Sequence, residues 1–142
     1  MEFNTLNIDT NCNCTKEGLI DNTSHFALKM NKQNIRENDF KTYWEKGKTS
    51  TECEEICSLK GQSLTIVNST EDLESTIEVY KKLFPFSPSY KPFCAIITLN
   101  ENSGVVKSTP IEINPLHYDF YKSDDFTIDK VNLIKTIPLA DV

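Results

Sequence analysis

A chain of 142 residues with a net charge of −6 and a pI near 4.9 lies in the size range of a single domain. Its negative average charge disfavours nucleic acid and anionic membranes as partners, because either would need a local basic patch. No apolar run approaches the length of a membrane span, and the start of the chain lacks the basic and apolar regions of a signal peptide. We therefore expect a soluble, cytoplasmic protein.

The chain begins with a polar segment, residues 1–23, which is rich in Asn, Thr and Asp and predicts a loosely attached N-terminal arm. Residues 24–142 are expected to form one α+β domain. Its first element is a strand over residues 25–30, where apolar and polar side chains alternate.

Three helices are predicted from capping residues and apolar stripes. The first begins at Asn34 and ends at Gly47, and the second lies between Thr51 and Gly61. The third, over residues 68–85, has the clearest amphipathic pattern, with acidic residues in its first turn.

Apolar runs at residues 64–67 and 93–99 flank the third helix and predict strands that are covered on both faces. This order predicts a β-α-β unit whose strands are parallel and are neighbours or near neighbours. Further strands are expected at 105–107, 116–122 and 132–137. The prediction is an α+β fold with a mixed sheet of about five strands and about three helices.

The five cysteines are an odd number, so they cannot all pair within the chain, and without a secretory signal we expect reduced thiols. One residue separates Cys12 from Cys14, and Cys53 and Cys57 have helical spacing; neither pair matches a structural zinc knuckle. No Gly-rich phosphate loop occurs either. We expect no metal and no cofactor.

The two histidines are the candidates for acid–base chemistry, because their ordinary pKa lies near neutrality. If their predicted strands are neighbours, His25 and His117 would form a polar row with Asp119 and Tyr121. The alternative is a solvated sheet face without reactivity, since any strand places residues two apart on one face. The nearest approach to a nucleophile motif is Gly61-Gln62-Ser63-Leu64, whose glycine is already explained as the end of a helix.

Protein binding is predicted from two other features. Glu74 and Glu78 are four residues apart on the outer stripe of an acidic helix, which suits a partner with a basic face. Phe86 and Tyr90 lie in the loop 85–92, which three prolines stiffen, and can anchor a partner at low entropic cost. The alternative is an ordinary solvated helix surface.

Residues 24–122 contain a series of short motifs: His25-Phe26, Asp39-Phe40, Gly61-x-Ser63-Leu64, Gly104-Val105-Val106-Lys107 and His117-Tyr118. In these motifs the sequence resembles an uncharacterised group of short bacterial proteins, which implies a stand-alone domain and no particular chemistry. A fainter likeness to compact ADP-ribosyltransferase-type domains rests on His25 and Ser63, with Glu112 as the available glutamate.

These features give three hypotheses. The first is a small protein-binding factor of the immunity or accessory type, acting through the acidic helix and the aromatic, proline-rich loop. The second is a small hydrolase or transferase that uses His25 and His117. The third is a binder of a small ligand.

Overall fold

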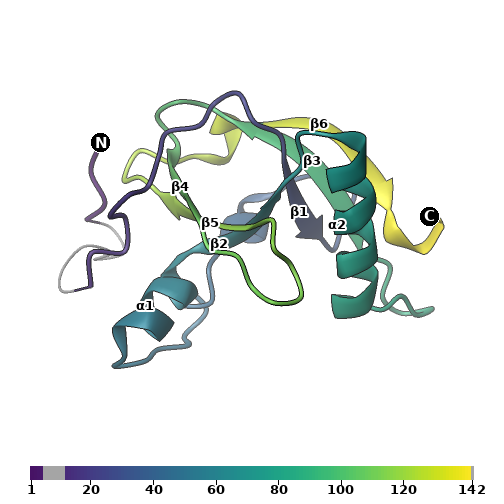
Figure 1. Cartoon of the computed structure of the whole chain (residues 1–142), viewed down its shortest axis with the longest axis horizontal. Coiled ribbons are helices and arrows are strands. Elements are labelled where there is room, and N and C mark those ends of the chain that lie inside the picture. Colours follow the sequence, from purple (N-terminus) through teal and green to yellow (C-terminus); the bar gives the residue numbers. More distant parts are fainter. Residues whose placement is uncertain (5–11, 142) are drawn as a thin grey trace.

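The computed structural model describes residues 1–4 and 12–141, which form an α+β fold around a six-stranded sheet (Figure 1). The strand order is β4-β5-β2-β1-β3-β6. The strands are β1 (Phe26–Met30), β2 (Gln62–Ile66), β3 (Phe93–Leu99), β4 (Gly104–Ser108), β5 (His117–Lys122) and β6 (Val131–Pro138). The helices are α1 (Cys53–Lys60) and α2 (Thr70–Leu83), with short 3-10 turns at Glu37–Phe40, Ile128–Lys130 and Leu139–Asp141.

The predicted β-α-β unit is present as β2-α2-β3. Both strands pair antiparallel with β1, which lies between them, so β2 and β3 run parallel as near neighbours. The insertion of β1 explains why the predicted mixed sheet is wrong: every hydrogen-bonded strand pair in the described part of the chain is antiparallel. The sheet also has six strands rather than about five.

Two apolar layers cover the two faces of the sheet. On one face α2 packs against the central strands, with Ala27, Tyr80 and Ile96 in the same buried cluster. On the other face Phe26, Phe40 and Ile97 belong to a larger cluster. Because β3 is buried on both faces, it lacks the polar alternation of a strand with one solvated side.

The predicted helix over residues 34–47 does not form. The chain makes the short 3-10 turn, is extended at Lys41 and starts a separate turn at Thr42, where the Glu45 carboxylate accepts from the Thr42 backbone N–H and the Thr42 hydroxyl accepts from the Glu45 N–H. Such a reciprocal capping pair marks the start of a helical turn, so the chain begins a new turn at Thr42 instead of continuing one helix from Asn34. The structure therefore has two α-helices instead of about three.

The N-terminal arm is fastened to the domain, and the expectation of reduced thiols is wrong. Disulfides join Cys12 to Cys53 and Cys14 to Cys57, with a Cα–Cα distance of 5.2 Å in each. The helical spacing of the α1 cysteines places both on the side of α1 that faces the arm. Cys94 is the free cysteine, and it is buried.

The arm also covers the outer edge of β4. Leu19 and Val106 exchange two backbone hydrogen bonds, 2.9 Å and 2.8 Å long, in an isolated antiparallel bridge. Figure 1 shows the N-terminus and α1 at one side of the molecule, with α2 at the other. Among the described residues, no helix has the length and apolar character needed to span a membrane.

Candidate functional site

A cleft opens where β1 and β2 separate. The ladder between these strands contains only the pairs Phe26–Ile66 and Ala27–Thr65, whereas β1 and β3 are paired over the whole of β1. From Thr65 toward the start of β2 the two strands are apart, and the space between them is a cavity of about 230 Å³. Polar side chains on its floor are Ser63, Thr65, Tyr80, Asn114 and His117, and exposed apolar side chains on its rim are Tyr43, Leu83 and Ile111.

A directed chain of hydrogen bonds fixes the inner part of the floor. The Tyr80 hydroxyl donates to the carbonyl oxygen of Ala27 at 3.1 Å, so the Thr65 hydroxyl, 3.1 Å away, donates to Tyr80. The Asn114 amide in turn donates to the Thr65 oxygen at 2.9 Å. Burial raises the pKa of Tyr80, so its hydroxyl stays protonated and keeps its role as a donor.

Next to this chain, Ser63 and His117 form a hydrogen-bonded pair. The Ser63 hydroxyl lies 3.1 Å from His117 Nε2, and His117 Nδ1 lies 3.0 Å from the carbonyl oxygen and 2.9 Å from the hydroxyl oxygen of Thr109. A carbonyl oxygen only accepts, and the Thr109 hydroxyl donates to Asp119, so both contacts are satisfied when Nδ1 carries the proton of the neutral ring. Nε2 is then the acceptor, and the Ser63 hydroxyl donates to it.

The strand register places Asp119 directly opposite Ser63 on β5. Burial raises the pKa of Asp119, against the opposing effects of His117, of a hydrogen bond from Thr109 and of Lys107. A Cβ atom on Gly61 would lie 3.0 Å from the Asp119 side chain. Gly61 therefore provides room for this carboxyl group, besides ending α1 as predicted.

The structure brings together only part of the predicted polar row. His117 and Asp119 lie on one face of β5, but His25 precedes β1, and β2 lies between β1 and β5. A site with both histidines requires that their strands are neighbours, and β1 and β5 are not neighbours. Tyr121 lies on the same face, where its hydroxyl donates to the carbonyl oxygen of Cys57 at 2.9 Å.

The four residues predicted to bind a partner lie on or just after α2. Glu74 and Glu78 are exposed on the helix. Phe86 is 51% exposed, whereas Tyr90 is half-buried with the Lys29 ammonium 5.8 Å from its ring centre. Two backbone hydrogen bonds between Ser87 and Tyr90 close the loop.

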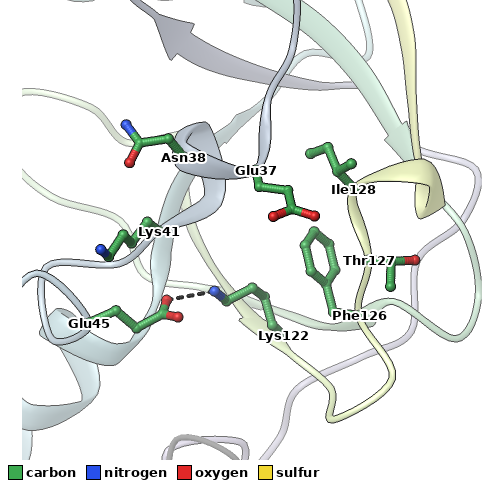
Figure 2. Close-up of a pocket in the computed structure, with 8 residues that line it drawn as sticks. All are labelled: Glu37, Asn38, Lys41, Glu45, Lys122, Phe126, Thr127 and Ile128. Atoms are coloured by element: carbon green, nitrogen blue, oxygen red, sulfur yellow. Dashed lines mark hydrogen bonds and ion pairs between the residues drawn. The ribbon is translucent and has the colours of Figure 1, made fainter.

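A second hollow, of about 420 Å³, lies between the 3-10 turn Glu37–Phe40 and the segment that follows β5. Figure 2 shows Lys122 reaching across it to Glu45, with which it forms an ion pair of 2.5 Å, while Glu37 lies beside Phe126. Because Lys122 and Glu45 are already paired with each other, they are not placed to bind a ligand in this hollow. In the described ranges no group of three or more His, Cys, Asp or Glu side chains is placed to hold a metal ion.

Comparison with protein-family models, curated proteins and solved structures gives no match. The cleft between β1 and β2 is therefore the candidate functional site on its geometry alone. Thr109 and Asn114 were not among the candidate residues from the sequence. Ser63 was considered there as the nearest approach to a nucleophile motif but was not linked to His117, because only the pairing of β2 with β5 brings the two together.

Proposed function

We propose that the chain is a small protein-binding factor that receives one side chain of its partner in the cleft between β1 and β2. The observation that carries this proposal is the exposure of three apolar side chains on the cleft rim: Tyr43 is 54%, Leu83 44% and Ile111 46% exposed. Exposed apolar groups gathered around one opening mark interaction sites more often than scattered ones do.

The size of the cleft supports a side chain rather than a cofactor as its occupant. Its volume of about 230 Å³ is below the range of roughly 300–1,000 Å³ that is usual for small-molecule sites. The polar floor below an apolar rim suits a large side chain with an apolar body and a polar tip. Such a buried anchor, with apolar contacts that exclude water around it, is the usual form of an interface hot spot.

Two neighbouring features extend this surface. Phe86 follows Leu83 by three residues and supplies a further exposed aromatic ring. Glu74 and Glu78 give the outer face of α2 a negative charge, which attracts a basic partner during encounter. The two disulfides support a partner in an oxidising compartment rather than in the cytoplasm, where thiols are kept reduced.

Site-directed photocrosslinking tests this proposal. A photoreactive phenylalanine analogue is placed at Tyr43 on the rim or, as the matched control, at exposed Leu133 on the edge strand β6. We expect one defined protein adduct from position 43 in the source cells and none from position 133. Equal capture at both positions, or no adduct at position 43, would contradict the proposal.

The captured partner then allows a kinetic test. Glu74→Lys with Glu78→Lys should slow association at low salt, because the steering charge is reversed. Leu83→Ser or Phe86→Ala should instead speed dissociation, because they remove contacts made only after docking. Leu133→Ser is the matched apolar control and should leave both rates unchanged.

A further inference from the structure

The Ser63 hydroxyl is exposed in the cleft and donates to Nε2 of a histidine whose neutral tautomer is set by the bond on the other side of the ring. A serine is a weak nucleophile until an adjacent base takes its proton, and a neutral imidazole nitrogen at 3.1 Å is such a base. We propose that Ser63 is a catalytic nucleophile and that the cleft hydrolyses small carboxylic esters. This activity uses the same cleft as partner binding but does not rest on it.

The direction of the β2 backbone supplies a donor for the oxyanion. The N–H of Val67 bonds to the carbonyl oxygen of His25 on the β1 side, whereas the N–H of Ile66 bonds to Leu116 on the β5 side. Alternate residues of a strand direct their N–H groups to opposite sides, so the N–H of Ser63 points toward β1. The β1–β2 ladder has ended there, and this N–H therefore opens into the cleft.

The reaction follows from these positions. The Ser63 oxygen attacks the ester carbonyl carbon while its proton moves to His117 Nε2, and the Ser63 N–H stabilises the negative charge on the carbonyl oxygen. The bond to the alcohol oxygen breaks, and that oxygen takes the proton from His117. Water then attacks the acyl-serine with the same base, which releases the acid and restores the Ser63 hydroxyl.

His117 is held for this task by Thr109, which acts as a positioning residue. Its carbonyl oxygen accepts from Nδ1 and so keeps Nε2 unprotonated in the neutral ring. The substrate class follows from the cleft: its volume admits a short acyl group, and the exposed rim side chains Tyr43 and Ile111 offer contacts to an apolar alcohol group.

Active-site labelling tests the proposal directly. A fluorophosphonate probe should lose fluoride and form a phosphonate ester with the Ser63 oxygen, and mass spectrometry of the digested full chain should locate the adduct on Ser63. Ser63→Ala should abolish the label, and Ser75→Ala, an exposed serine on α2, should leave it unchanged. An unlabelled protein, or a label on another residue, would overturn the proposal.

Turnover of p-nitrophenyl acetate provides the second measurement. We expect Ser63→Ala and His117→Gln each to lower the hydrolysis rate by about 10²-fold or more, the usual range for losing a nucleophile or its base. Thermal unfolding establishes that each variant is folded. The labelling of the unaltered chain tests the proposal even if a variant does not fold. A rate that Ser63→Ala leaves unchanged would overturn the assignment.

Discussion

The hydroxyl of Tyr80 donates a hydrogen bond to the carbonyl oxygen of Ala27, at the residue pair where the β1–β2 ladder ends. This bond joins α2 to the sheet at the head of the cleft. Tyr80→Phe removes it and also leaves the buried Thr65 hydroxyl without its acceptor. We expect a loss of about 1–3 kcal/mol in the free energy of unfolding, the usual cost of an unsatisfied buried polar group.

Urea denaturation measures this loss, and Tyr43→Phe is the matched control, because the Tyr43 side chain is exposed on the cleft rim. The control should change stability by less than about 0.5 kcal/mol, as is usual for surface substitutions. Equal effects of the two substitutions would show that the chain of hydrogen bonds below the cleft does not stabilise the fold.

The structure and the sequence predict different numbers of free thiols. With two disulfides and Cys94 free, an unreduced sample should contain one reactive thiol per chain after denaturation. The native protein should react slowly, because burial raises the pKa of Cys94 to about 12 and leaves little thiolate. A thiol assay with and without denaturant measures both, and five thiols in the unreduced, denatured chain would contradict the disulfides.

Ile96 tests the central position of β3. It is 3% exposed and packs in the cluster below α2. Ile96→Ala should lower the free energy of unfolding by about 2–5 kcal/mol, the range for truncating a buried isoleucine. Ile134→Ala on the exposed part of β6 is the matched control, because Ile134 is 51% exposed. A loss below about 1 kcal/mol for Ile96→Ala would contradict a well-packed site at this strand.

Local patterns in the sequence predict most of the fold. All six strands and both α-helices coincide with segments where apolar period, caps and breakers agree, as in α2, whose Ser69 accepts from the N–H of Asp72. The predicted helix over 34–47 fails because the backbone is extended at Lys41 and a separate turn starts at Thr42, where Thr42 and Glu45 form a capping pair that the apolar period does not show.

The candidate site depends on contacts that no local pattern contains. Ser63 meets His117 across 54 residues of sequence, and Cys14 meets Cys57 across 43. Residue spacing alone does not show that β2 neighbours β5 or that the arm lies against α1. The sequence therefore indicated His117 and Asp119 as candidates, but paired them with His25 instead of Ser63.

Asp119 makes stability depend on pH in a direction opposite to that of most carboxyl groups. Its folded pKa is raised above the ordinary 3.8, chiefly by burial, so the folded state binds more protons than the unfolded state above that pH. The contribution of Asp119 to stability is therefore full below its unfolded pKa and is lost as pH rises through the folded pKa. Asp119→Asn removes this loss, and the stability of the variant relative to the original chain should increase as the pH rises above about 4.

Glu45→Gln is the control with the opposite sign. Burial opposes the shift, but hydrogen bonds from Lys122 and Thr42 hold the pKa of Glu45 below the ordinary 4.5, so its contribution is present above that pH and is lost on acidification. The relative stability of Glu45→Gln should therefore fall as the pH rises toward about 4.5 and stay level at higher pH. Urea denaturation at a series of pH values measures both variants. A relative stability of Asp119→Asn that stays level or decreases as pH rises would show that the buried carboxyl group opposite Ser63 does not have a raised pKa.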